Sequence, residues 1–228
     1  MKKTILLILL FAFANFINAQ DDVEQLPWDN QIYLGNKLSY GINKWKSSTE
    51  LQVRLKNDFR SLDNWYVEQV ASYLMSNSIE LVPDMRITLK PEVTEYRFGF
   101  GVLYKIKKNK FQFINQDKIQ VDITDKGNVS YAFREVVFTN YRVKENIIAT
   151  FVAGFIYRWR DEWNGFQYLR VGPGISYIFD EKHILNISYF TGLENAATYS
   201  RWSGIPMLQL IINVGNNYKY VPAYYFNF

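Results

Sequence analysis

Charged side chains recur at every second position along much of the chain, between apolar or aromatic neighbours. In the segment 95–106, Glu95 and Arg97 alternate with Phe98 and Phe100 in this way. Successive side chains of a β-strand point to opposite faces, so this spacing predicts strands with one charged and one apolar face. Fixed charges gathered on an enclosed face attract counter-ions, and the chemistry that they indicate is electrostatic recognition of small ions.

The same alternation places eleven of the basic residues of the chain on one face, together with a smaller acidic set. We predict that this face lines the interior of a barrel. One hypothesis is a positively biased lumen that passes or binds small anionic solutes. The other is a packed interior in which the charges neutralise one another, and the sequence leaves both open. The predicted lumen residues are Arg54, Lys56, Arg86, Lys90, Arg97, Lys105, Arg134, Arg142, Arg158, Arg160 and Arg170, with Glu50, Glu68, Glu80, Asp84 and Glu95 facing them.

Nucleophilic and metal chemistry have little support. The chain contains no Cys and one His, and His183 directly follows Asp180 to Lys182 at a predicted turn. Lipid hydrolases need a nucleophile activated by a positioned base, and no Ser lies within two residues of His183. We therefore expect a protein without enzymatic activity, cofactor or metal site. An outer-membrane lipid-modifying enzyme is the alternative.

The amino-terminal residues have the features of an export signal. Lys2 and Lys3 precede an apolar run from Ile5 to Ala14, and Ala19 ends the segment. We predict a cleaved signal peptide over 1–19, a polar lead-in over 20–29 and a barrel over 30–228. Loss of Lys2 and Lys3 lowers the formal net charge of +4 by two, and a balance so close to neutral argues against a nucleic-acid binder.

Aromatic residues make up 18% of the chain although its mean hydropathy is only −0.19. This combination fits strands with one apolar and one polar face, and no mature segment approaches the ~18 apolar residues of a spanning helix. We predict a single closed antiparallel transmembrane β-barrel of about twelve strands, with ten as an alternative. Short turns alternate with longer loops, of which 192–204 is the longest, and 215–217 is a turn. The strands are expected at 31–42, 45–59, 65–76, 79–90, 95–106, 110–123, 129–143, 147–160, 166–179, 183–191, 205–214 and 218–228.

Several residues disturb the pattern. Asn115, Asp117 and Glu135 fall on predicted apolar faces, which indicates bulges or a register that is wrong by one residue. Four prolines lie inside predicted strands and indicate further bulges or strand ends, because a closed barrel has no free edge for a residue without an N–H. These are Pro83, Pro173, Pro206 and Pro222.

The chain ends in aromatic residues on one face of the last predicted strand, Tyr224, Phe226 and Phe228. This end resembles the signal that outer-membrane barrels present to their assembly machinery. We therefore expect an outer-membrane location, with outer-membrane lipid and the barrel-assembly machinery as partners. A secreted soluble β-barrel binder is the alternative, and it would turn its apolar face inward.

Several short segments resemble a family of uncharacterised small outer-membrane barrels of Gram-negative bacteria, a domain of unknown function. The resemblance implies the same fold and brings no activity with it. The chain departs from the family in its Pro-containing tail, 218–228. The similar segments are Leu51 to Leu55, Asp63 to Tyr66, Arg86, Arg97, Arg170 to Gly172 and Ile187 to Tyr189.

Overall fold

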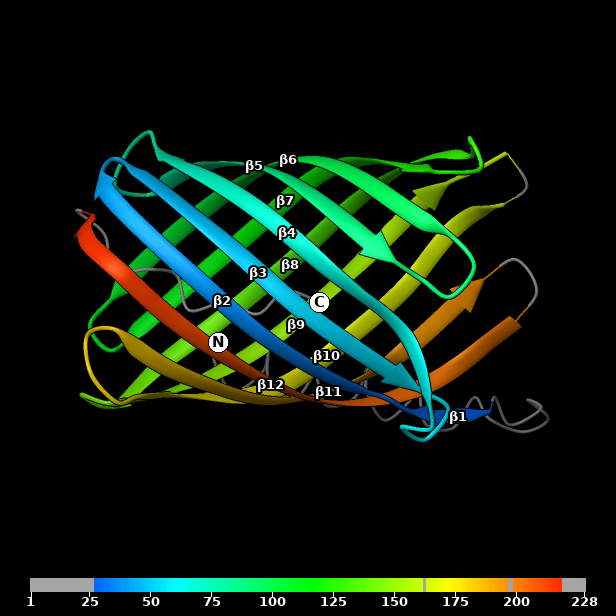
Figure 1. Cartoon of the computed structure of the whole chain (residues 1–228). Helices are drawn as coiled ribbons and strands as arrows, with labels where there is room; N and C mark the ends of the chain where they lie inside the picture. The colour runs from blue at the N-terminus through cyan, green and yellow to red at the C-terminus, as the bar shows by residue number, and fades with distance from the viewer. Residues whose placement is uncertain (1–26, 162, 197–198, 219–228) are drawn as a thin grey trace, which may run out of the picture.

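The computed structural model describes residues 27–161, 163–196 and 199–218, and strands dominate them (Figure 1). The predicted signal peptide, most of the predicted strand 218–228 and its aromatic residues Tyr224, Phe226 and Phe228 lie outside this part. No helix in the described ranges has the length and apolar character needed to cross a membrane. The strands are β1 (Trp28–Asn30), β2 (Ile32–Asn43), β3 (Trp45–Lys56), β4 (Ser61–Leu74), β5 (Ile79–Leu89), β6 (Thr94–Lys108), β7 (Phe111–Thr124), β8 (Val129–Lys144), β9 (Ile147–Trp159), β10 (Asn164–Ile178), β11 (His183–Ala196) and β12 (Tyr199–Tyr218).

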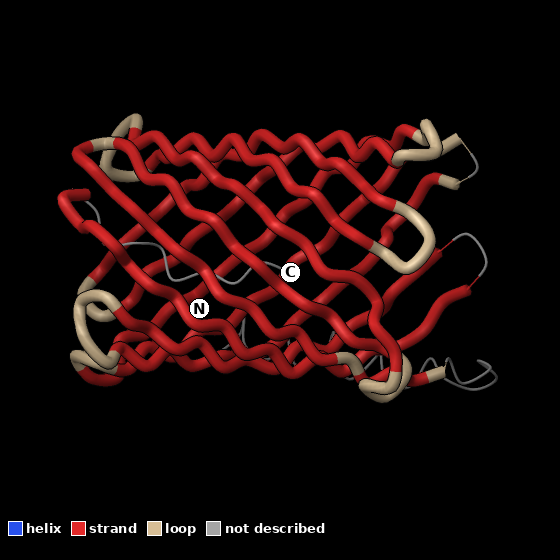
Figure 2. Tube along the Cα trace, in the orientation of Figure 1, coloured by secondary structure: helices blue, strands red, loops and turns tan. Residues whose placement is uncertain are grey.

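The strands form one sheet that closes on itself, which confirms the predicted barrel (Figure 2). From β2 to β12 each strand pairs with the next in antiparallel order, and β12 then pairs with β2 in parallel. The closing pair is parallel because an up-and-down ring with an odd number of strands brings its first and last strands together in the same direction. For the same reason β2 begins at one end of the barrel and β12 ends at the other (Figure 1), whereas the twelve strands expected from the sequence would have brought both ends of the barrel chain to one side.

The short strand β1 continues the line of β2 along β12. Trp28 lies opposite Trp202 and Tyr33 lies opposite Met207, so five residues separate the two pairs on both strands and the register is unbroken. Pro206 faces the break between β1 and β2 and has no N–H to donate. β1 is therefore the beginning of the first strand, and the ring itself has eleven strands. We call the end where β1 lies the β1 end.

Two other prolines lie inside strands without a bulge. Pro83 and Pro173 both point outward, and the pairing of β4 with β5 and of β10 with β11 is interrupted beside them without a change of register. Each remains opposite a residue on its other neighbouring strand, Phe100 and Phe151 respectively. The prediction of bulges or strand ends at these two positions is therefore wrong, because a local gap in one ladder accommodates the missing N–H.

The predicted irregularities at Asn115, Asp117 and Glu135 are also absent. The pairing of β7 with β8 runs without a shift over their whole length, and Asp117 lies directly opposite Glu135. Both acids are partly exposed on the outer face, where Asn115 Nδ2 donates to Asp117 Oδ2 at 2.9 Å. The prediction that these residues lie on the apolar face was correct, and the prediction of bulges or a wrong register was not. Among the described residues these are the two charged side chains on the outer face away from the strand ends.

The connections are shorter than the sequence indicated. Each connection spans at most four residues. The predicted loop 192–204 is wrong, because β11 extends to Ala196 and β12 begins at Tyr199. The predicted turn 215–217 is also wrong, because these residues belong to β12. The glycines that indicated a loop instead admit aromatic rings. A Cβ on Gly204 would lie 2.5 Å from the Tyr189 hydroxyl, and one on Gly215 would lie 2.8 Å from the Tyr40 ring.

The outer surface is an apolar band with aromatic rings near both ends. Trp45 packs on Tyr73 with ring centroids 4.6 Å apart at one end, and Tyr157 packs on Trp159 at 4.9 Å near the β1 end. Large apolar side chains are exposed between these rings. They include Leu34, Leu38, Leu51, Val67, Met85, Ile87, Phe98, Phe100, Ile119, Phe151, Leu169, Ile175, Ile187 and Leu208.

The interior is packed and contains apolar as well as charged side chains. Val82, Leu103, Ile114, Phe138 and Phe190 belong to one buried cluster, and the last four have no exposed surface. The cluster runs along the barrel, since Val82 and Ile114 follow by three residues the strand starts at the end away from the β1 end, whereas Tyr33 and Tyr168 lie near the β1 end. The interior is therefore not the purely polar face that the alternation indicated.

Gly99 makes room for an ion pair that spans β6. Lys118 Nζ contacts Asp84 Oδ1 at 2.6 Å, and a Cβ on Gly99 would lie 2.3 Å from Lys118 Cε and 2.7 Å from the Asp84 oxygens. We expect Gly99→Ala to lower the free energy of unfolding by about 1–3 kcal/mol, because the buried pair must shift. Equilibrium urea unfolding in detergent micelles measures this. Gly35→Ala is the control, since its Cβ would meet only ordinary contacts of 3.5 Å and beyond.

Candidate functional site

The structure places most of the predicted lumen residues inside the barrel. Arg54 and Arg142 are partly exposed, and Lys56, Lys90 and Arg160 lie near strand ends. Lys105 and Asp84 are buried. The predicted site residues that are buried are Glu50, Glu68, Glu80, Arg86, Glu95, Arg97, Arg134, Arg158 and Arg170.

A cavity of about 310 Å³ lies inside the barrel at the β1 end. Strands from both halves of the chain line it, because the closed sheet brings β2 to β5 opposite β9 to β12. The eight cations of its lining outnumber the three acids, so the cavity is positively biased. The cations are Arg54, Arg86, Lys90, Arg97, Arg158, Arg160, Arg170 and Arg201, and the acids are Asp63, Glu95 and Glu194.

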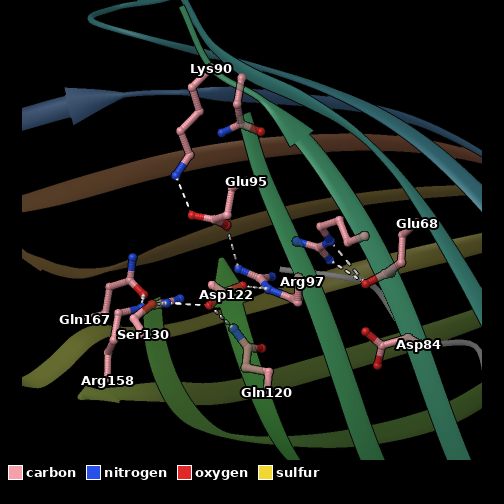
Figure 3. A network of polar contacts seen from close by, with 12 residues as sticks. Glu68, Asp84, Lys90, Glu95, Arg97, Gln120, Asp122, Ser130, Arg158 and Gln167 are labelled. Atoms are coloured by element: carbon pink, nitrogen blue, oxygen red, sulfur yellow. Dashed lines mark hydrogen bonds and ion pairs between the residues drawn. The ribbon is translucent and has the colours of Figure 1, made fainter. Parts of the chain in front are cut away.

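One wall of the cavity is an ion-pair chain in which each cation is matched (Figure 3). Lys90 Nζ contacts Glu95 Oε2 at 2.8 Å, and Arg97 Nη2 contacts the other oxygen of Glu95 at 3.3 Å. Arg97 Nε donates to Asp122 Oδ1 at 2.5 Å, and Arg158 Nη1 contacts Asp122 Oδ2. The chain thus connects β6, β7 and β9, and each of its two acids contacts two of its three cations.

The other wall is a row of alternating guanidinium groups and tyrosine rings, which we call the arginine–tyrosine row. It consists of Tyr168 and Arg170 on β10, Tyr33 on β2, Arg54 on β3 and Tyr66 on β4. Arg170 Cζ lies 4.2 Å from the centre of the Tyr168 ring and 5.6 Å from that of Tyr33, and Arg54 Cζ lies 4.2 Å from Tyr33 and 5.1 Å from Tyr66. Cation–π attraction stabilises such stacks, by more where water is excluded.

The row contains buried donors without acceptors. Arg54 Nε donates to Gln52 Oε1 at 2.7 Å, and Arg170 Nη2 contacts Glu194. Arg54 Nη2 and both Arg170 Nε and Nη1 have no hydrogen-bond partner in the described part of the chain. A buried donor without an acceptor costs about 1–3 kcal/mol, and more when it is charged. A small anion beside the row would supply the missing acceptors, and carboxylate and phosphate groups match guanidinium geometry.

Beyond the cavity the described side chains fill the barrel. Lys105 is paired with Glu80, and Lys37 Nζ lies 3.7 Å from Glu50 Oε2. Val82, Leu103 and Ile114 of the buried apolar cluster lie in the same half of the barrel, as does a second buried group of Ile148, Ile184 and Ile211. The cavity is therefore closed at its inner end. The far half of the barrel has the packed interior that was one of the two hypotheses from the sequence.

Sequence reasoning missed part of this site. Glu194 and Arg201 lay in the predicted loop 192–204, and Tyr33 and Tyr66 were not connected with the arginines. Tyr33 and Tyr66 lie between residues of the apolar face in β2 and β4, and this alternation predicts that both rings point inward. Which cation each ring meets depends on the register between strands, and no single segment of the sequence contains that information.

The one His lies away from the cavity. His183 begins β11 at the opposite end and is exposed, with Nδ1 3.0 Å from both Asp180 oxygens. Hydrogen bonds from the His183 ring and from the Lys182 and His183 amides hold the pKa of Asp180 below its usual value. No group of three or more potential metal ligands occurs among the described residues.

Comparison with known proteins finds a similar fold but no matching family. No family model matches it, and no curated protein matches it, so the resemblance to an uncharacterised family stays a prediction. Among solved structures, the NanC porin in a rhombohedral crystal form has a similar fold, with a TM-score of 0.50 and 11% identity over 72% of this chain and 86% of that one. The chain has a porin-like β-barrel fold.

Asp122 connects two arginines in the ion-pair chain, which yields a stability prediction. Asp122→Asn leaves Arg97 and Arg158 without their shared carboxylate, and we expect the free energy of unfolding to fall by about 3–5 kcal/mol. Thermal and urea unfolding in detergent measure the loss. Asp161→Asn, at an exposed residue in a connection, is the control and should change stability by at most ~0.5 kcal/mol. An equal effect of the two variants would contradict the role assigned to Asp122.

Proposed function

We propose that this protein is an outer-membrane barrel, not an enzyme, that binds small anionic solutes in the arginine-rich cavity at its β1 end. The observation that carries the proposal is the arginine–tyrosine row. There, buried guanidinium donors of Arg54 and Arg170 lack acceptors beside a cavity in which cations outnumber acids. Arginine presents such donors in a fixed fork that favours carboxylate and phosphate groups.

The outer-membrane location is supported by the surface and by the ends of the sequence. An exposed apolar band with aromatic rings near both ends is the surface that a bilayer covers. The predicted export signal at 1–19 and the aromatic end with Phe228 agree with this location. Outer-membrane lipid and the barrel-assembly machinery are the partners that the proposal includes.

Replacement of the two row arginines tests anion binding. We expect Arg54→Met and Arg170→Met each to weaken the binding of inorganic phosphate about tenfold or more, because each removes a charge-assisted donor. Isothermal titration calorimetry of the detergent-solubilised protein with phosphate, and with choline as a cationic probe, measures this.

Arg142→Met is the matched control for this experiment. Arg142 carries the same charge, but it lies near the opposite end, where Nη1 donates to the Glu145 carbonyl oxygen at 3.1 Å. Its replacement should leave phosphate affinity unchanged. Equal affinities in the wild type and in both row variants would reject the assignment of the site.

A water-filled channel is the second candidate, because the NanC structure that shares the fold is described as a porin. The buried cluster around Phe138 and Phe190 opposes it in this chain. We expect no steady conductance from the wild-type protein in planar bilayers. Phe138→Ala combined with Phe190→Ala should produce conductance, because it removes two rings from the packed interior. Stable anion-selective conductance of the wild type would favour the channel instead.

A further inference from the structure

Glu194 of β11 holds one end of the arginine–tyrosine row. Its Oε1 accepts a hydrogen bond from Arg170 Nη2, and both side chains are largely buried. Arg170 keeps Nε and Nη1 without partners. The carboxylate of Glu194 thus contacts the guanidinium group that an anionic ligand would use, and it competes with that ligand.

Glu194 also has other donors to which it can turn. Its Oε2 accepts from Arg201 Nε at 3.1 Å and lies 3.0 Å from Arg201 Nη2. Gln31 Nε2 donates to the same oxygen at 3.1 Å. The carboxylate therefore stays paired when Arg170 turns to a ligand, which makes the exchange energetically cheap.

The strand β1 holds Arg201, which shares the Glu194 carboxylate with Arg170. Arg201 Nη1 lies 3.0 Å from Oδ2 of the buried Asp29. The other Asp29 oxygen accepts from the backbone amides of Asn57 at 2.7 Å and Asp58 at 3.4 Å. Both of these residues have left-handed backbone conformations, with φ of 55°. Asp29 is thereby held by the β3–β4 connection and in turn holds Arg201.

We infer that Glu194 determines the anion affinity of the cavity by competing for Arg170, and that Asp29 is a positioning residue that acts on Glu194 through Arg201. The inference rests on the proposed function. Without Asp29, Arg201 loses one carboxylate partner and turns further toward Glu194, which draws Glu194 away from Arg170. Loss of either acid therefore increases the affinity for an anion.

The test compares single and double variants with inorganic phosphate as the probe. Glu194→Gln should raise phosphate affinity about fivefold or more, within the usual range of coupling between two sites. Asp29→Asn should raise it about twofold in the wild type and leave it unchanged in the Glu194→Gln background. Such non-additivity identifies a residue that acts through Glu194, whereas a general change of charge would be additive. Glu194→Asp, which shortens the reach to Arg170, should give an intermediate affinity.

Glu92→Gln is the matched control, because Glu92 carries the same charge and lies at the same end of the barrel, in the connection between β5 and β6, but is exposed and does not line the cavity. It should change phosphate affinity by less than twofold. An increase equal to that of Glu194→Gln would overturn the inference in favour of a general field effect. Equal binding by the wild type and Glu194→Gln would overturn it alone. Absence of phosphate binding in both proteins would overturn the proposed function as well.

Discussion

The pairing of β12 with β2 is the constraint on which the rest of the structure depends. In the membrane that we propose as the location of this barrel, a sheet surrounded by hydrocarbon cannot leave an edge unpaired, because no water is present to bind the exposed N–H and C=O groups. With eleven strands in the ring, closure requires a parallel pair, which is slightly less stable per residue than an antiparallel one. β12 compensates by its length, since β1 and β2 together pair with it along most of its twenty residues.

Closure also decides where the charges lie. A strand with alternating side chains in a ring must place one set outside and the other inside, and the apolar set of this chain faces outward. Buried charges are tolerated when they are paired, and Asp122 with its two arginines is an example in which each cation finds an acid. At the β1 end the supply of acids is insufficient, so the row from Tyr168 to Tyr66 uses aromatic faces where carboxylates are missing.

The sequence was sufficient for the features that depend on local alternation. The strand 95–106 and the outward direction of Glu135 follow from counting by two, and the structure agrees with both. It was insufficient where two strands determine the outcome together. Gly204 ended the predicted loop 192–204, but it lies in β12, where a Cβ would meet the Tyr189 hydroxyl of the neighbouring strand β11. The contact between Arg170 and Tyr33 joins residues far apart in the sequence, and only the closed register reveals it.

The two halves of the interior differ in how they are filled. The far half is filled by apolar side chains such as Leu103 and Ile114 and by balanced pairs such as Lys105 with Glu80, and close packing of this kind stabilises the barrel and excludes water. The half at the β1 end contains a cavity, and buried guanidinium donors there have no hydrogen-bond acceptor. Unmatched buried donors destabilise a protein on their own, and those of Arg54 and Arg170 lie beside the cavity, where Glu194 is shared between Arg170 and Arg201. The anion that we propose as the ligand of this cavity would supply the missing acceptors.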